Sequence, residues 1–459
     1  MSHNTDILIE THKFNIREIM HNQPIMNVGT TGHVANGKST TTKCLSSKET
    51  QQFSKEKERN ITIRLGYANT KIWRCDICDP PQCYSSSDSS TMIKNCSHCN
   101  ANLELVNHIS IVDCPGHSEL TSTMLNGSSV MDYAILVEAC NNENIPAVQT
   151  AEHLIATRAA KIPTVMIIMN KIDLINKKKA YEQIEKIKNY VLSLTELSTC
   201  PFIIPVSATF GTNIDVVCHR LSMLKVPKER DPSAQFKMIA IRSFDINKPG
   251  SSLSKLHGGV IGGTIMRGSL KVGDRVNIYP GMTKRIIASE KKKEGADFKY
   301  EPVSGEVLSI KSDTNELDFA IPGGLLGVQL TIDPAFARND LLAGSLVLKT
   351  TDVETSQNPD DVVKVFDKIV IKLSNLMISG KDVNTLMKNS PQLMININSN
   401  NIDCTVYKYS NSKKELFLLL NKPIAIDSND NLATVMHKNN SKDIIGRGVI
   451  IDGIRCDRM

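Results

Sequence analysis

This 459-residue sequence lacks any long apolar run. None of its runs approaches the roughly 20 residues that a helix needs to cross a bilayer. Residues 1–15 are polar and lack the apolar stretch of a secretory signal. These absences argue against a membrane partner and against export, so we expect a cytoplasmic protein.

The sequence also lacks a strong excess of charge of either sign. The formal net charge is +6, with 41% hydrophobic and 22% charged residues, which is ordinary for a globular protein. Lysines gather in short clusters, such as 177–179 and 291–293, that are more often solvated surface than nucleic-acid sites. Charge therefore permits a polyanionic partner without requiring one.

Short apolar runs alternate with longer amphipathic stretches from residue 25 to about residue 224. The predicted strands are 25–28, 109–112, 134–137, 164–169 and 202–206, and the predicted helices include 148–160 and 180–194. Strands that alternate with helices predict a mostly parallel sheet with helices on both faces. Such a sheet binds its ligand at the carboxyl ends of its strands.

The pattern of apolar residues and glycines changes after a polar linker at 225–232. Short apolar runs are then separated by glycines, such as Gly258-Gly259 and Gly262-Gly263, which leaves little room for helices and predicts a β-barrel. A second polar boundary lies near 350–361, and the remainder is again strand-like. We therefore predict an α/β domain over 1–226 and two β-barrel domains over 233–350 and 358–459.

The stretch Gly32 to Ser39 fits the P-loop pattern of glycine, four residues, then Gly-Lys-Ser. Its glycines let backbone N–H groups turn toward phosphates, and the helix that follows directs its positive end at them. Lys38 would reach the β and γ phosphates, and the Ser39 hydroxyl would ligate Mg²⁺. The predicted contacts are Gly32, Ala35, Asn36, Gly37, Lys38, Ser39 and Thr40.

A second motif, Asp113-Cys114-Pro115-Gly116-His117, follows a predicted strand. Asp113 can hold a magnesium-bound water, and the Gly116 amide can sense a γ-phosphate. His117 can orient the attacking water, so we assign it a catalytic role. The sequence offers no obvious arginine finger, so we expect hydrolysis to be slow without an activating partner.

Two further motifs point to a guanine base. The first is Asn170-Lys171-Ile172-Asp173, whose Asp173 carboxylate can accept hydrogen bonds from N1–H and the exocyclic amine of guanine. Adenine has no matching pair of donors. Ser207-Ala208 can present a backbone amide to the guanine O6. The predicted base contacts are Asn170, Lys171, Asp173, Ser207, Ala208 and Thr209.

Five of the twelve cysteines lie in a short insert at residues 75–99. Thiols in the cytosol stay reduced, which disfavours disulfides. Cys75-x-x-Cys78 and Cys96-x-x-Cys99 have the spacing of a structural zinc site. Cys83 is a competing ligand, and an insert that no longer binds metal is the alternative.

With these motifs in this order, the sequence resembles the translational GTPases. Within them it is similar to the gamma subunits of eukaryotic and archaeal translation initiation factor 2. The segments that carry the resemblance are 28–41, 58–71, 112–119, 149–154, 258–274, 322–348 and, less sharply, 443–453. The resemblance implies a P-loop GTPase domain followed by two β-barrels, and it covers most of the chain.

The resemblance implies GTP-dependent delivery of methionyl initiator tRNA to the small ribosomal subunit, with GTP hydrolysis as the release switch. It implies a heterotrimer with alpha and beta subunits, and GTPase-activating and nucleotide-exchange factors as further partners. The cofactors would be GTP or GDP, Mg²⁺ and one structural Zn²⁺. By position, Thr62 matches the threonine that completes the Mg²⁺ shell when the γ-phosphate is present.

Two residues depart from the pattern of that family. Asn36 stands where its members usually carry histidine, and Arg447 stands where they often have an aromatic residue. An elongation-type or selenocysteine-specific tRNA carrier is the first alternative, although the cysteine insert and residues 333–344 favour the initiation factor. The second alternative is a scaffold that binds GTP without turnover, against which Lys38, Thr62 and His117 argue.

Overall fold

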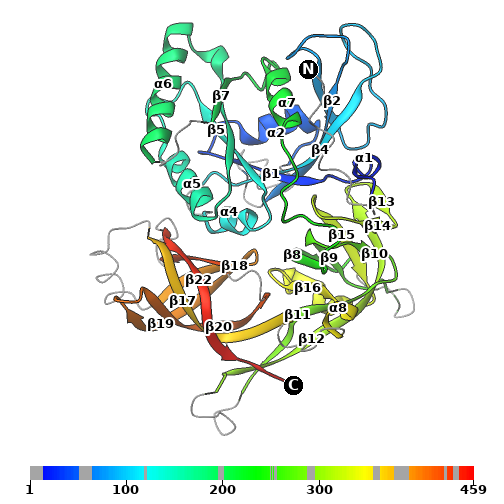
Figure 1. The fold of residues 1–459 in the computed structure, drawn as a ribbon, viewed down its shortest axis with the longest axis vertical. Helices are drawn as coiled ribbons and strands as arrows, with labels where there is room; N and C mark the ends of the chain where they lie inside the picture. The colour runs from blue at the N-terminus through cyan, green and yellow to red at the C-terminus, as the bar shows by residue number, and fades with distance from the viewer. Residues whose placement is uncertain are drawn as a thin grey trace. The chain divides into compact units, whose positions relative to one another are not determined.

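The protein forms two compact units in the computed structural model (Figure 1). The first comprises residues 1–233 with 312–315 and 322–325, and the second comprises 234–311, 316–321 and 326–459. The structure describes residues 14–50, 62, 65–117, 121–194, 201–248, 250, 252, 256–286, 295–354, 362–376, 392–427, 432–437 and 444–459. The lysine cluster 291–293 and most of the boundary predicted at 350–361 lie outside these residues.

The first unit contains a seven-stranded sheet in the order β3-β2-β4-β1-β5-β6-β7. Its strands are β1 (Met26–Thr31), β2 (Gly66–Arg74), β3 (Tyr84–Asp88), β4 (Glu104–Asp113), β5 (Tyr133–Ala139), β6 (Thr164–Asn170) and β7 (Phe202–Pro205). Strand β1 pairs in parallel with β4 and β5, and β5, β6 and β7 continue the parallel run. Strand β2 is antiparallel to both β3 and β4.

Helices lie on both faces of this sheet. They are α1 (Ile16–Ile19), α2 (Lys38–Ser46), α4 (Thr121–Ser128), α5 (Val148–Ala159), α6 (Lys177–Leu194) and α7 (Ile214–Ser222), with the 3₁₀ turn η2 (Ile172–Leu174). Figure 1 shows α5 and α6 on one side of β5 and β7, with α2 and α7 on the other. Because the central strands are covered twice, they are buried along almost their whole length: every residue of β1 is buried, and Val28, Ile135 and Ile167 are fully buried.

The predicted parallel sheet is confirmed, and each predicted strand overlaps an observed one. The sequence patterns did not predict β2, which leads into the cysteine-rich insert, or β3, which lies within the insert and pairs with β2 in antiparallel fashion. The predicted linker also packs on the first unit. Within it, Arg230 forms an ion pair of 2.7 Å with Asp132, and both side chains are almost fully buried.

The second unit begins with a barrel of six long strands. They are β8 (Lys237–Phe244), β9 (Val260–Arg267), β11 (Arg275–Arg285), β12 (Phe298–Ser312), β15 (Leu326–Leu330) and β16 (Leu346–Lys349). The order β11-β16-β8-β9-β15-β12 is closed by pairing of β11 with β12. Shorter elements accompany them: β10 (Leu270–Lys271), β13 (Asn315–Leu317), β14 (Phe319–Ala320), η4 (Pro334–Asp340) and α8 (Thr350–Glu354).

A second closed barrel follows in the order β17-β20-β19-β18-β21-β22. Its strands are β17 (Val363–Leu376), β18 (Gln392–Ile397), β19 (Asn400–Ser410), β20 (Glu415–Asp427), β21 (Leu432–His437) and β22 (Ile444–Arg455). Inward residues such as Ile371, Leu393 and Leu416 are fully buried, and they fill the barrel as the alternation of strand side chains requires. The last strand, β23 (Asp457–Arg458), pairs with β12 of the first barrel.

Buried charges connect the two barrels within the second unit. The Asp427 carboxylate on β20 lies 3.5 Å from the Lys237 ammonium on β8, and it also pairs with Arg267 on β9. Lys237 and Asp427 are almost fully buried. The barrels therefore behave as one compact unit, and the domain limits 233–350 and 358–459 stay a prediction.

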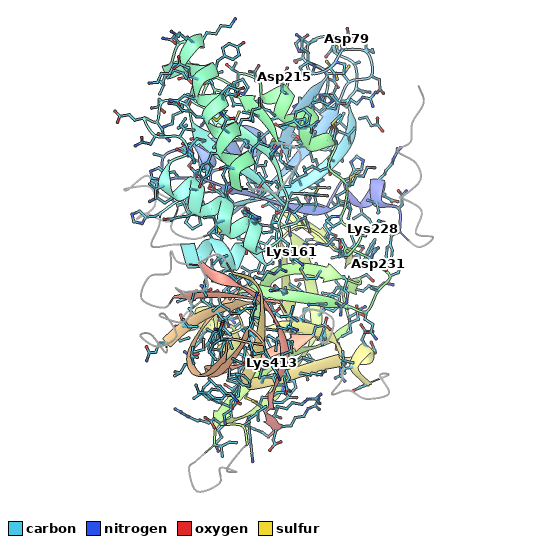
Figure 2. All side chains as sticks on the ribbon, turned by 60° about the vertical axis from the view of Figure 1, so that its left-hand side comes forward. Asp79, Lys161, Asp215, Lys228, Asp231 and Lys413 are labelled. Carbon is cyan, nitrogen blue, oxygen red and sulfur yellow. The ribbon has the colours of Figure 1, made fainter. Side chains whose placement is uncertain are left out.

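Charged side chains project from the surface of each unit, among them Asp79 and Lys161 in the first and Lys413 in the second (Figure 2). The lysine cluster 177–179 is exposed at the start of α6, as expected for a solvated surface. Among the described residues, no helix is both long and apolar enough to cross a membrane.

Candidate functional site

The loop between β1 and α2 has a shape that only glycine permits at two positions. Gly32 and Gly37 have φ angles of +133° and +91°. A Cβ at Gly32 would collide with the carbonyl oxygen of Val137, and one at Gly37 would collide with the side-chain amide of Asn170. Helix α2 begins directly after the loop, so its positive end faces this turn.

Lys38 folds back over the loop that precedes it. Its ammonium donates hydrogen bonds to the carbonyl oxygens of Gly32 at 3.0 Å and His33 at 2.9 Å. A Cβ at Gly116 would collide with the same ammonium, so the backbone of Gly116 passes directly beside it. Burial lowers the pKa of Lys38, and Asp113 opposes this shift. The structure therefore brings the two predicted phosphate motifs together.

Hydroxyl groups from three segments surround the Asp113 carboxylate at the end of β4. Ser39 and Thr50 each donate to Oδ2 at 2.6 Å, and Thr30 donates to Oδ1 at 3.1 Å. The Ser39 hydroxyl also lies 2.9 Å from that of Thr62. Carboxylate and hydroxyl oxygens are the hard donors that Mg²⁺ prefers, so this cluster fits a magnesium ion.

The predicted base motifs meet the phosphate loop through Asn170. Its Nδ2 donates to the Asn36 carbonyl oxygen at 3.0 Å, and its Oδ1 accepts from the Ala208 amide at 3.0 Å. Asp173 lies in η2 and is exposed, as is Thr209 in the second motif. Asn170 thus fixes the spacing between the two loops, while Asp173 stays accessible to a ligand.

His117 follows Gly116 and is exposed. Its neighbour Gly116 packs against the phosphate loop, since a Cβ at Gly116 would lie 2.8 Å from the Val34 amide nitrogen and 2.9 Å from the His33 carbonyl carbon. The arrangement is compatible with the predicted catalytic role of His117, which stays a prediction.

Four cysteine sulfurs of the insert lie within 4.8 Å of one another: those of Cys75, Cys78, Cys96 and Cys99. Cys75 and Cys99 are 3.4 Å apart, and Cys78 and Cys96 are 3.7 Å apart. A tetrahedral ion with Zn–S bonds of about 2.3 Å places its sulfurs about 3.8 Å apart. The four residues therefore fit one zinc ion.

Backbone amides favour the thiolate form of one of these sulfurs. The amides of Cys99 and His98 donate to the Cys96 sulfur and lower the pKa of its thiol to about 6. The His98 amide lies 3.4 Å from that sulfur. Cys83, the predicted competitor, is buried beside the cluster but does not belong to the four-sulfur group.

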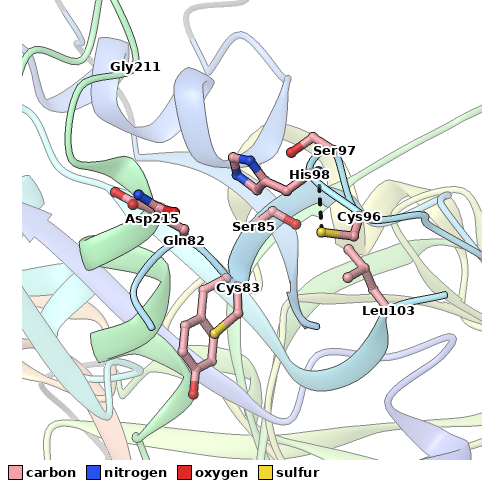
Figure 3. Close-up of a pocket in the computed structure, with 10 residues that line it drawn as sticks. Gln82, Cys83, Ser85, Cys96, Ser97, His98, Leu103, Gly211 and Asp215 are labelled. Carbon is pink, nitrogen blue, oxygen red and sulfur yellow. Dashed lines mark hydrogen bonds between the residues drawn. The ribbon is translucent and has the colours of Figure 1, made fainter. Parts of the chain in front are cut away.

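A cavity of about 400 Å³ lies beside the cysteine cluster (Figure 3). Gln82, Cys83 and His98 line it from the insert, and Gly211 and Asp215 line it from the segment that enters α7. The insert therefore packs against the segment that follows the predicted base motif at 207–209.

The sequence patterns did not reveal several polar residues that support the site. Thr30 and Thr50 donate to Asp113, Thr150 and His153 accept from amides of the phosphate loop, and Glu138 accepts from Asn142. A signal existed for one of them, because Glu138 is an acidic residue inside the apolar run 134–139. The others are common residue types whose partners lie far away in the sequence.

Comparison of the chain with known proteins shows which family it is similar to. The sequence model described as "Elongation factor Tu GTP binding domain" matches residues 23–229. The chain is 37% identical over 438 residues to the "Eukaryotic translation initiation factor 2 subunit gamma" of Encephalitozoon cuniculi, covering 95% of this chain and 94% of the relative. It is 38% identical over 449 residues to subunit 3 of the same factor from Drosophila melanogaster, covering 95% and 90%.

An archaeal relative and two solved structures extend the comparison. The "Translation initiation factor 2 subunit gamma" of Methanococcus vannielii is 36% identical over 431 residues, covering 94% of this chain and 99% of the relative. A bacterial selenocysteine-specific elongation factor has a TM-score of 0.65 at 17% identity, covering 93% of this chain and 58% of that one. SelB from Methanococcus maripaludis with GppNHp has a TM-score of 0.63 at 19% identity, covering 94% and 80%. At these identities the structures show a shared fold alone.

Proposed function

Since this chain belongs to the family of translation initiation factor 2 gamma subunits, we propose that it carries methionyl initiator tRNA to the small ribosomal subunit in a GTP-dependent manner. GTP hydrolysis is the step that releases the tRNA. The observation that carries this proposal is the convergence of Lys38, Ser39, Thr62 and Asp113 at one edge of the sheet, within a chain that matches the gamma subunits over almost its full length.

Each motif of the nucleotide site has a separate role. The loop 32–37 and Lys38 bind the phosphates, and Asp173 with the Ala208 amide recognises guanine. Ser39 and Thr62 would ligate Mg²⁺, and Asp113 would hold one of its waters. When bound, Mg²⁺ neutralises charge on the β and γ phosphates. Thr62 and Gly116 approach the γ-phosphate and so distinguish GTP from GDP.

Membership of this family supports a proposal for the partners and the location. The chain is the gamma subunit of a heterotrimer with alpha and beta subunits, and it acts in the cytoplasm. A GTPase-activating factor stimulates hydrolysis, and an exchange factor restores the GTP form. The cysteine insert binds one structural Zn²⁺ through Cys75, Cys78, Cys96 and Cys99, which stabilises a loop too polar to form its own core.

An elongation-type or selenocysteine-specific carrier is a second candidate, because solved structures of selenocysteine-specific factors share the fold. Affinity for tRNA separates the two functions. With the GTP analogue GppNHp bound, we expect the assembled heterotrimer to bind methionyl initiator tRNA at least about tenfold more tightly than methionyl elongator tRNA. Filter binding with both tRNAs measures this ratio, and equal affinities would contradict initiator delivery.

Replacing His117 tests the catalytic assignment. His117→Ala should slow phosphate release by roughly 10²- to 10⁴-fold, because the attacking water loses the side chain that orients it. Single-turnover hydrolysis with the activating factor and the small ribosomal subunit measures the rate. GDP affinity should stay unchanged, and hydrolysis at the normal rate would remove His117 from the mechanism. No phosphate release from the unaltered protein would support the alternative of a scaffold without turnover.

Metal analysis tests the zinc assignment. The purified protein should contain one zinc ion per chain, measured by atomic emission. Cys96→Ser should abolish the bound zinc, because a hydroxyl does not replace a thiolate ligand. The matched control is Cys83→Ser, which alters a neighbouring buried thiol outside the four-sulfur group and should keep the zinc. Zinc retained by Cys96→Ser and lost by Cys83→Ser would show that the ligand set is wrong.

A further inference from the structure

A fully buried carboxylate lies near the carboxyl end of β5, in the sheet of the first unit. Glu138 is the next-to-last residue of β5, a strand otherwise made of apolar residues and Tyr133, and its side chain is 0% exposed. A buried carboxylate is costly unless hydrogen bonds satisfy it. Its donors therefore indicate what it does.

The donors of Glu138 come from the segment that leads into α5. Asn142 Nδ2 donates to Oε1 at 2.6 Å, and the Ala147 amide donates to Oε2 at 3.4 Å. Asn142 Nδ2 also donates to Asn36 Oδ1 at 3.1 Å, which links the carboxylate to the phosphate loop. Burial raises the pKa of Glu138, and these hydrogen bonds oppose that shift because they favour the ionised form.

Asn36 continues this link to Thr150. Asn36 Nδ2 donates to Thr150 Oγ at 3.3 Å, and Thr150 Oγ also accepts from the backbone amide of His33 at 3.1 Å. A hydroxyl has two lone pairs to accept with, and these two bonds use both of them. The carboxylate of Glu138 therefore connects to the His33 amide through Asn142, Asn36 and Thr150.

A second side chain of α5 holds the preceding residue of the loop. His153 is 0% exposed, and its Nδ1 accepts from the Gly32 amide at 2.9 Å. Burial and the positive charge of Lys38 lower the pKa of His153 to about 3, so its imidazole is neutral and Nδ1 can accept. The first two amides of the loop are thus bonded to α5, which fixes where the remaining loop backbone lies.

We propose that Glu138 is a positioning residue for guanine nucleotides, which acts through Asn142, Asn36 and Thr150 to hold the loop 32–37 in its phosphate-binding shape. The proposal rests on the proposed binding of nucleotide at this loop. Asn36 is the central link, because its Oδ1 accepts from Asn142 and its Nδ2 donates to the Val137 carbonyl oxygen and to Thr150 Oγ. One carboxylate thus orients the series of side chains that contacts the loop.

The test compares variants of the full chain by the affinity and release rate of a fluorescent GDP. Glu138→Gln keeps the size of the side chain but replaces one acceptor oxygen with a donor. It should weaken GDP binding about tenfold or more, mainly through faster release. The matched control is Glu143→Gln, which removes the same charge from an exposed residue nearby and should bind as the unaltered chain does.

Thr150 variants separate positioning from general stability. Thr150→Val should weaken GDP binding about as much as Glu138→Gln, whereas Thr150→Ser keeps the hydroxyl and should bind normally. The double variant Glu138→Gln/Thr150→Val should bind no more weakly than the weaker single variant, because both changes break the same relay. Should Glu138→Gln fail to fold, the contrast between Thr150→Val and Thr150→Ser still decides the proposal.

Three results would overturn the proposal. They are normal GDP release by Glu138→Gln, losses that multiply in the double variant, and equal binding by Thr150→Val and Thr150→Ser. In each case the unaltered chain still binds GDP, so the proposed function stands. If the unaltered chain binds neither GDP nor GTP, the proposed function fails and this proposal fails with it.

Discussion

Asp113 occupies a fully buried position at the end of β4, where a carboxylate must be satisfied by hydrogen-bond donors. Hydroxyls from β1, from α2 and from Thr50 supply them. This one requirement draws together segments that are far apart in the sequence and sets the Ser39 hydroxyl beside Thr62. A cluster of hard oxygen donors results next to the Lys38 ammonium, as a magnesium-nucleotide site requires.

Close packing at glycines builds the rest of the site. Gly32, Gly37 and Gly116 each lie where a side chain would collide with a neighbouring group, so backbone rather than side chains lines the phosphate position. Asn170 then links this loop to the Ala208 amide, which joins phosphate binding to base recognition. Hydrogen bonds therefore join these loops to one another, as a nucleotide switch requires.

Much of this site could be predicted from sequence, because its motifs follow consecutive parallel strands whose carboxyl ends meet at one edge. The group of four cysteines could also be predicted, because the spacing within each pair is local. Strand β2 was missed because buried polar residues such as Asn69, Thr70 and Lys71 interrupt the alternation that marks a strand.

The supporting residues could not be predicted because each depends on a partner distant in the sequence. Glu138 lies about a hundred residues from the loop that it supports through Asn142, and no local pattern shows that Thr150 and His153 face the same loop. Their roles emerge only when the sheet brings β5 and α5 beside β1. The exclusion of Cys83 from the sulfur cluster likewise depends on three-dimensional geometry.

The central claim is that the oxygen cluster around Asp113 detects the γ-phosphate and thereby raises the affinity of the factor for tRNA. The most direct measurement is the affinity of the assembled factor for methionyl initiator tRNA with GppNHp bound and with GDP bound. Because Thr62 and Gly116 meet the γ-phosphate only in the triphosphate form, the account predicts binding at least about tenfold tighter with GppNHp. Equal affinity in the two nucleotide states would contradict it.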